Sequence, residues 1–264
     1  MRNRNELKAF YRALLLAGLL CFIASCSSKP DVQQEVAQDK TQAADLVSQA
    51  DKLYAERADL AKTREGIGLL RRATALDTGS YDAAWRLSRF DYFLGDHTKD
   101  KSERDRAFNE GVEAGRRAVK VQDGKPEGHF WLGANLGGRA ENSTLSGLTS
   151  VDEIRTEMER VIQLDEGFEA GSAYMALGQI YLEAPKMLGG DTKRAVEVLE
   201  KGSRFGQENE LYHLQLAKAY KEVKRIDDAR RELNTVINMK PDPNYIPEHD
   251  DAVAEAKKIL DEMK

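Results

Sequence analysis

The sequence predicts an all-α fold of consecutive helix pairs, and three observations support this prediction. Beyond Gln42, apolar residues recur at spacings of three and four, which is the period of an amphipathic helix. No segment alternates apolar and polar residues over more than a few positions, as a half-buried strand would. Clusters of Gly, Pro, Asp and Asn separate the candidate helices, which fall in pairs. This organisation is typical of a helical repeat protein.

The first 25 residues have the organisation of a secretory signal. Residues 1–12 carry four basic side chains and one acidic side chain, and the apolar run 13–24 follows them. This run is shorter than the roughly 20 residues that a membrane-spanning helix needs. It ends in Ile23-Ala24-Ser25-Cys26, which resembles the bacterial lipobox. The resemblance implies cleavage between Ser25 and Cys26 and lipidation of the Cys26 thiol. The alternative is an ordinary cleavage site beside a coincidental cysteine.

The signal peptide 1–25 is expected to be followed by a flexible tether over 26–41 and by the repeat domain over 42–264. The start of the mature chain is polar and has too little apolar content to pack. Cleavage takes away four basic residues and one acidic residue, so the formal net charge falls from −5 to −8, which argues against a nucleic-acid partner. Ser27, not Asp, follows the cysteine, and this resembles lipoproteins sorted to the outer membrane. We therefore expect a lipid-anchored protein of the cell envelope that faces the periplasm from the outer membrane.

The helix pairs repeat the pattern of the tetratricopeptide (TPR) motif. In this motif an aromatic residue, Leu-Gly and Tyr mark the first helix, and spaced small residues followed by Pro mark the second. The fullest copy is the last, and it consists of Leu216, Ala217, Tyr220, Ala229, Leu233, Val236 and Pro241. Earlier copies contain Tyr174 and Leu132, and a further copy is expected to use Trp85 and Tyr92 as packing positions.

Equivalent second-helix positions give the length of each repeat. Successive positions lie 45, 43, 41 and 34 residues apart, at Ala73, Ala118, Val161, Gly202 and Val236. Only the last interval equals the standard TPR length, so insertions of 11, 9 and 7 residues are expected as loops between helices, including a long loop over 137–150. The amphipathic segment 248–263 is expected to cap the last repeat. The predicted fold is a TPR superhelix of about five helix pairs plus a C-terminal capping helix.

Two segments are more distinctive than the generic repeat. One is 129–137, His-Phe-Trp-Leu-Gly-Ala-Asn-Leu-Gly, and the other is 184–191, Ala-Pro-Lys-Met-Leu-Gly-Gly-Asp. Together with the lipobox they resemble the T component associated with TRAP-type (tripartite ATP-independent periplasmic) transport systems. The second segment also resembles eukaryotic regulators of microtubule dynamics. Resemblance to the T component implies a lipid-anchored helical scaffold that associates with a solute-binding protein. For the second segment the alternative is a structural turn, in which Asp191 caps the next helix.

First helices line the concave face of TPR superhelices, where such proteins bind their partners. Residues beside the expected packing positions form the candidate groove, which comprises Arg86, Phe90, Phe93, Phe130, Asn135, Met175, Gln179, Leu214 and Lys218. Three phenylalanines and a methionine beside cationic and amide groups suit an apolar body with a polar end. The alternative is that the phenylalanines belong to the core beneath the inserted loops.

The sequence contains no recognisable catalytic or metal-binding motif. None of the four histidines lies at a ligand spacing such as His-Glu-x-x-His, so neither a metal nor a cofactor is predicted. No Gly-x-Ser-x-Gly elbow, phosphate loop or dinucleotide motif is present, and we expect no enzymatic activity. His129 and His213 stand where the repeat has an aromatic ring and are expected in the core. His97 and His249 are expected in loops.

These features favour a membrane-anchored, periplasm-facing scaffold that mediates protein–protein interaction. An accessory role in TRAP-type solute uptake is the more specific hypothesis, and its protein partner would be a periplasmic solute-binding protein. Two alternatives stay open: direct binding of a small molecule in the central groove, and assembly of outer-membrane proteins or pili. The sequence is compatible with a homo-oligomer.

Overall fold

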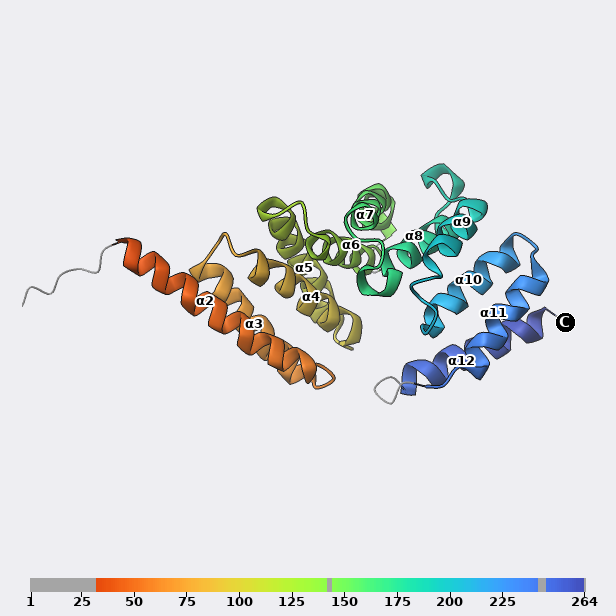
Figure 1. The fold of residues 1–264 in the computed structure, drawn as a ribbon, viewed down its shortest axis with the longest axis horizontal. Coiled ribbons are helices and arrows are strands. Elements are labelled where there is room, and N and C mark those ends of the chain that lie inside the picture. Colours follow the sequence, from red (N-terminus) through yellow and green to blue (C-terminus); the bar gives the residue numbers. More distant parts are fainter. Residues whose placement is uncertain (1–31, 142–143, 242–245, 264) are drawn as a thin grey trace, which may run out of the picture. The chain divides into compact units, whose positions relative to one another are not determined.

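The computed structural model describes residues 32–141, 144–241 and 246–263 (Figure 1). Every regular element within these ranges is an α-helix or a short 3₁₀ helix. The all-α fold class is therefore confirmed. The chain forms two compact units, Met1–Asp39 and Lys40–Lys264. The predicted signal peptide, its cleavage site and Cys26 lie outside the described residues.

The described helices follow one another in pairs. The first helices are α2 (Val32–Ala55), α4 (Tyr81–His97), α6 (Pro126–Glu141), α8 (Ser172–Glu183) and α10 (Glu210–Glu222). The second helices are α3 (Leu60–Leu76), α5 (Lys101–Val121), α7 (Thr144–Leu164), α9 (Thr192–Gly202) and α11 (Ile226–Asn238), and α12 (Ile246–Glu262) closes the series. From α3 onward each helix contacts its successor, and α4 also contacts α6, as α8 contacts α10. These contacts confirm the stacking of helix pairs with a final capping helix.

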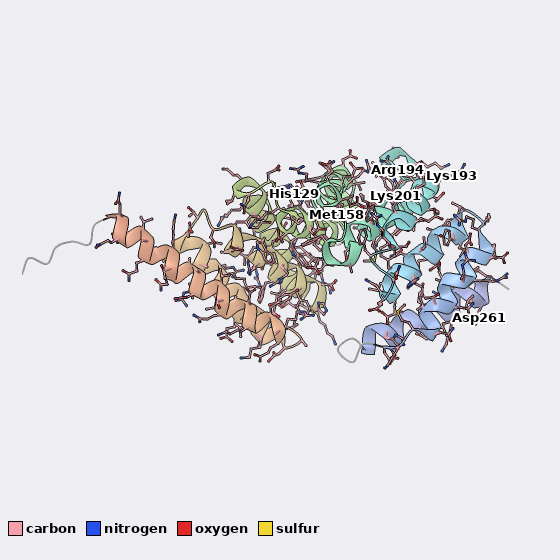
Figure 2. The ribbon with its side chains drawn as sticks, in the orientation of Figure 1. His129, Met158, Lys193, Arg194, Lys201 and Asp261 are labelled. Carbon is pink, nitrogen blue, oxygen red and sulfur yellow. The ribbon has the colours of Figure 1, made fainter. Side chains whose placement is uncertain are left out.

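Four positions recur in the first helices and set the register of each repeat. In the order α4, α6, α8 and α10, the first position is Ala84, His129, Tyr174 and His213, and the second is Leu87, Leu132, Leu177 and Leu216. In the same order, the third position is Ser88, Gly133, Gly178 and Ala217, and the fourth is Asp91, Leu136, Tyr181 and Tyr220. All are buried except the half-buried His213. In α4 the expected packing positions Trp85 and Tyr92 are therefore wrong by one residue. Small side chains at the third position allow close approach, since a Cβ on Gly133 would overlap the side chain of Met158 of α7. Met158 is labelled in Figure 2.

Side chains at the helix starts satisfy backbone donors of the first turn. The side chains of Asp59, Ser80, Asp100, Asp191 and Asn209 each accept a hydrogen bond from a backbone N–H of the helix that follows. Such caps stabilise a helix by about 1 kcal/mol each. They explain why Asp and Asn recur between the elements, and they fix where α3, α4, α5, α9 and α10 begin.

The inserted residues lengthen helices instead of forming the predicted loops. The long loop expected over 137–150 is wrong, because α6 continues to Glu141 and α7 begins at Thr144. Gly138 stays helical with its Cα against the ring of Phe108, where a Cβ would overlap the ring. Both α5 and α7 have 21 residues, whereas α9 has 11 and α11 has 13. Two short 3₁₀ helices, η1 (Phe168–Gly171) and η2 (Lys186–Leu188), use the remaining insertion.

The N-terminal boundary also differs from the expected one. Helix α2 begins at Val32, so the part of the predicted tether from 32 to 41 is helical. Burial begins only at Ala43, which is 2% exposed and belongs to the core cluster of the first pair with Leu70. Within the described ranges, no helix has the length and apolar content required to cross a bilayer.

Candidate functional site

Aromatic and arginine side chains gather on the first helices of the first two pairs. The set consists of Tyr54 of α2 and Trp85, Arg86, Arg89 and Phe93 of α4, and we call it the aromatic–arginine cluster. Each of the five is half-buried. The register of α4 explains this placement, because Trp85 and Arg89 directly follow the buried Ala84 and Ser88. Their side chains therefore lie at the margin of the packed face.

Arg89 is the centre of this cluster. Its guanidinium carbon lies 3.7 Å from the centroid of the Tyr54 ring and 4.9 Å from that of Trp85. Its Nη2 donates to Asp51 Oδ1 at 3.1 Å, while the buried Nε has no hydrogen-bond partner in the described residues. Burial lowers the pKa of Arg89, and the nearby Tyr54 and Asp51 oppose this shift. Stacking on two rings is a favourable environment for a partly desolvated guanidinium.

Arg86 is held by two carboxylates. Its Nε lies 2.9 Å from both oxygens of Asp51, and its Nη1 donates to Asp82 Oδ1 at 2.7 Å. Its guanidinium carbon also lies 4.2 Å from the centroid of the Trp85 ring. Arg86 and Arg89 thus balance the charges of Asp51 and Asp82. The cluster presents planar aromatic and guanidinium groups without a strong local charge.

A second group of aromatic side chains links α6 to η1. It includes Tyr92, which directly precedes Phe93 of the aromatic–arginine cluster in the sequence. The Phe130 ring lies 5.3 Å from Phe168 and 5.0 Å from Trp131, measured between centroids, and Trp131 lies 5.7 Å from Tyr92. The chain after Phe168 is left-handed over three residues, with φ of 47°, 54° and 78° up to Gly171. Left-handed geometry at the two non-glycine residues costs about 1–2 kcal/mol each. The contact of Phe168 with Phe130 helps to offset this strain.

The structure separates the predicted groove residues into two sets. Phe90 and Asn135 are fully buried and Leu214 is 6% exposed, so their assignment to a groove is wrong. The Phe90 ring occupies the space beside Gly66 of α3. The Asn135 amide donates to the backbone oxygens of Ser88 and Trp131 at 2.9 and 2.7 Å. These three residues hold helices together.

The other predicted residues are half-buried on first helices. Arg86 and Phe93 lie in the aromatic–arginine cluster, and Phe130 lies beside Phe168. Met175 and Gln179 lie further along, on α8. Lys218 pairs with Glu255 of the capping helix at 3.7 Å. The structure therefore brings together only the residues of α4. Sequence reasoning missed Tyr54, Trp85 and Arg89, and the correct register of α4 would have identified the last two.

Three of the four histidines, His129, His213 and His249, pair with glutamates. His129 is buried, as predicted, and its Nδ1 lies 2.6 Å from Glu157 of α7. The half-buried His213 Nδ1 lies 2.7 Å from Glu232 of α11. His97 and His249 are not in loops: His97 is the last residue of α4, and His249 belongs to α12. In the part of the chain that the structure describes, no group of His, Cys, Asp and Glu is placed to hold a metal ion.

Solved structures similar to this chain are TPR proteins. TTC0263, a thermophilic TPR protein of Thermus thermophilus, is 16% identical with a TM-score of 0.58, over 81% of this chain and 98% of that one. PilF of Pseudomonas aeruginosa is 16% identical with a TM-score of 0.57, over 86% and 93%. YrrB, described as a TPR protein with an unusual peptide-binding site, is 13% identical with a TM-score of 0.52, over 86% and 97%. At these identities the likeness shows the fold, and it defines the chain as a TPR-like repeat protein.

The family model for regulator of microtubule dynamics protein 1-3 matches residues 46–183, from within α2 to the end of α8. The chain belongs to this family. The match includes the segment 129–137 but ends before 184–191, the segment on which the resemblance was expected. No curated protein matches the chain.

Proposed function

We propose that this chain is a membrane-anchored scaffold that binds a protein partner across the first helices of its repeats. The observation that carries the proposal is the aromatic–arginine cluster, in which tryptophan, tyrosine and arginine side chains remain partly accessible. These residue types dominate the energetic centres of protein–protein interfaces. Because Arg86 and Arg89 are already oriented by carboxylates and rings, little conformational entropy is lost when a partner covers them.

The proposed anchor is the lipid on Cys26. The basic head, the short apolar run and the small residues before Cys26 support it. A buried methylene contributes about 0.8 kcal/mol, and a single acyl chain binds a membrane only marginally, so a durable anchor needs more than one chain. We place the protein at the outer membrane, facing the periplasm, because Ser27 follows the cysteine.

For the partner we propose a periplasmic solute-binding protein, so that the scaffold is an accessory of TRAP-type solute uptake. The support is the resemblance of the segments 129–137 and 184–191 to the T component. The second segment also has a structural explanation. A Cβ on Gly189 would lie 2.6 Å from Arg155 Nη2, and Asp191 caps α9, so the turn needs these residues for packing. The resemblance therefore depends mainly on 129–137.

Crosslinking in intact cells, followed by purification of the whole chain, tests this function. The wild type is expected to recover a solute-binding protein of a TRAP-type system. The double variant Trp85→Ala, Phe130→Ala removes two rings that occupy equivalent positions in α4 and α6. Recovery is expected to fall roughly tenfold or more, since a loss of 1.4 kcal/mol is a factor of ten in affinity.

The matched control removes apolar side chains that lie elsewhere. Met187 is 90% exposed in η2 and Leu211 is 48% exposed in α10, so the double variant Met187→Ala, Leu211→Ala is expected to recover the partner as the wild type does. Circular dichroism should show the same helix content in all three proteins. If both double variants recover the partner equally well, the proposal that the partner binds over Trp85 and Phe130 is wrong. If repeated experiments recover no solute-binding protein with the wild type, the proposed transport role is wrong.

A further inference from the structure

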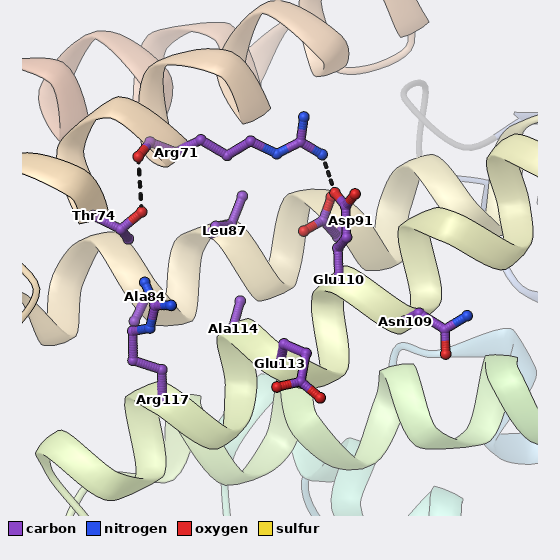
Figure 3. Close-up of a pocket in the computed structure, with 10 residues that line it drawn as sticks. All are labelled: Arg71, Thr74, Ala84, Leu87, Asp91, Asn109, Glu110, Glu113, Ala114 and Arg117. Carbon is purple, nitrogen blue, oxygen red and sulfur yellow. Dashed lines mark hydrogen bonds and ion pairs between the residues drawn. The ribbon is translucent and has the colours of Figure 1, made fainter.

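An open cavity of about 400 Å³ lies between α3, α4 and α5 (Figure 3). The residues that line it include Arg71, Ala84, Leu87, Asp91, Glu110 and Ala114. Helix α4 contacts both α3 and α5, and it supplies the floor through Ala84, Leu87 and Asp91. This volume is within the range of small-molecule sites, which starts at roughly 300 Å³.

The cavity exists where this repeat departs from the others. At the first packing position α4 has Ala84, where the later first helices have histidine or tyrosine. At the fourth position it has Asp91, where they have Leu136, Tyr181 and Tyr220. Both small residues line the cavity. The side chains that fill the equivalent space in the other repeats are thus missing from this one.

Asp91 carries a carboxyl group that the protein leaves without a partner. Its side chain is fully buried, and neither Oδ1 nor Oδ2 accepts a hydrogen bond from the described residues. These are the only carboxylate oxygens among the buried, unpaired atoms of that part of the chain. Burial and the charge of Glu110 raise the pKa of Asp91, and Arg71 opposes the shift. The raised pKa means that the buried carboxyl retains its proton more readily than an exposed one. A cationic group bound beside Asp91 would stabilise the ionised form, and the carboxylate would in turn hold the cation.

The lining of the cavity beside Asp91 is suited to the apolar part of a ligand. Leu87, Ala84 and Ala114 provide an apolar surface. The guanidinium of Arg71 pairs with Glu110 at the rim and is therefore engaged (Figure 3). We propose that this cavity binds a small organic amine, whose ammonium group pairs with Asp91 and whose apolar body lies on Leu87 and the two alanines. None of the residues that line this cavity belongs to the aromatic–arginine cluster, so this site is separate from the proposed partner face.

A second cavity, of about 370 Å³, does not share these features. It is lined by acidic residues that include Asp51, Asp77 and Asp82. Asp51 and Asp82 are paired with Arg86, and the Asp77 carboxylate accepts from the backbone N–H of Gly79 at 3.1 Å. Its acidic groups thus have partners within the protein. The unpaired carboxyl distinguishes the cavity at Asp91.

Binding of cyclohexylamine to the whole chain in detergent tests the proposal, with cyclohexanol as the uncharged control. Cyclohexylamine is expected to raise the Tm saturably and to shift the methyl resonances of Ala84 and Ala114. The methyls of Ala195 and Ala229, which lie in the cores of later repeats, should not move. Cyclohexanol should produce neither effect. Absence of a saturable shift at Ala84 and Ala114 would overturn the proposal.

Three variants distinguish the contribution of the Asp91 carboxyl group to binding from that of the charged side chains at the cavity opening. Asp91→Asn keeps the shape and removes the charge, so affinity for cyclohexylamine is expected to fall at least roughly tenfold. Asp91→Leu introduces the residue that α6 has at this position and should abolish binding. Glu113→Gln removes an exposed rim charge and should change the affinity by less than about threefold. Equal affinity of the wild type and Asp91→Asn would overturn the proposal, and this comparison does not depend on whether Asp91→Leu folds.

Discussion

His129 and His213 occupy equivalent positions in α6 and α10, and each forms the same two hydrogen bonds. In both residues Nδ1 bonds a glutamate of the second helix of the pair. In both, Nε2 bonds the backbone oxygen six residues earlier, at 2.8 Å for Asp123 and 3.1 Å for Gln207. Each imidazole therefore joins two helices of one pair to the preceding turn.

This arrangement predicts stability that decreases as the pH rises above neutrality. Burial lowers the pKa of His129, but its bonds with Glu157 and Asp123 outweigh burial and raise the pKa overall. The bond with Glu232 raises the pKa of His213. Because the folded pKa exceeds the unfolded value of about 6.5, the contribution is complete below that pH and is lost as the pH rises through the folded pKa.

Urea unfolding at pH 6 and pH 8 measures this effect. The wild type should have the higher free energy of unfolding at pH 6. The double variant His129→Tyr, His213→Tyr uses the residue that α8 has at this position, Tyr174, and should lose most of the difference between the two pH values. An unchanged difference in the double variant would assign the pH dependence to other groups.

Residues whose partners are distant in sequence were beyond prediction. The core position of His129 could be predicted because the repeat pattern itself places a ring there. Asn135 was assigned to a groove, since its partner Ser88 lies 47 residues away and only the fold brings the two together. Nothing in the sequence marks Asp91 as buried, because a carboxylate in a helix is normally solvated.

At the scale of elements, ion pairs link the second helices of successive pairs to one another. Close packing at glycines joins neighbouring helices. Arg64 Nε donates to Glu103 at 2.7 Å between α3 and α5, and Arg116 Nη2 donates to Glu153 at 2.9 Å between α5 and α7. Exposed pairs of this kind contribute about 0–1 kcal/mol each. Substitution of a glycine at a helix contact is expected to cost more than loss of an exposed ion pair. A side chain added there would push the two helices apart, and they would lose apolar contacts.

Two glycines of α3 provide a matched test of this packing. A Cβ on Gly66 would overlap the Phe90 ring, whereas nothing lies within 4 Å of a Cβ on Gly68. Gly66→Ala should destabilise the protein by about 1–3 kcal/mol through overpacking. Gly68→Ala should stabilise it by about 0.5–1 kcal/mol through helix propensity. Thermal or urea unfolding measures both, and equal effects would show that α3 can shift away from Phe90.

The lengths of the elements could be predicted only in part. The repeat spacing correctly indicated inserted residues, but their composition favoured loops because Gly137 and Gly138 are weak helix formers. Contact with Phe108 keeps Gly138 in α6, and this contact joins residues that the sequence pattern does not relate. Tertiary packing therefore decided between a loop and a longer helix.

At the scale of the whole molecule, the repeats form one continuous series with a covered C-terminal end. The last pair and α12 share a core that includes Leu233, Val236, Ala256 and Ile259. Lys218 and Lys221 of α10 also pair with Glu255 and Glu262 of α12. The series could be predicted well, because each pair repeats the same packing positions and the capping segment is amphipathic.

The location of the scaffold is expected to depend on a single thiol. Cys26→Ser removes the atom that would carry lipid, and Cys26 lies outside the described residues. The variant should keep its helix content and its Tm, while the protein moves from the sedimenting membrane fraction to the supernatant. Mass spectrometry of the N-terminal peptide should show acyl chains on the wild type alone.

Cys21→Ser is the matched control for this variant. Cys21 lies in the apolar run and is predicted to leave with the signal peptide, so its replacement should change neither the mass of the mature N-terminus nor the sedimentation. If Cys26→Ser also stays with the membranes, the attachment arises from an uncleaved apolar run or from a membrane-bound partner. Loss of partner crosslinking in Cys26→Ser, with its Tm unchanged, would show that the lipid brings the aromatic–arginine cluster to its partner.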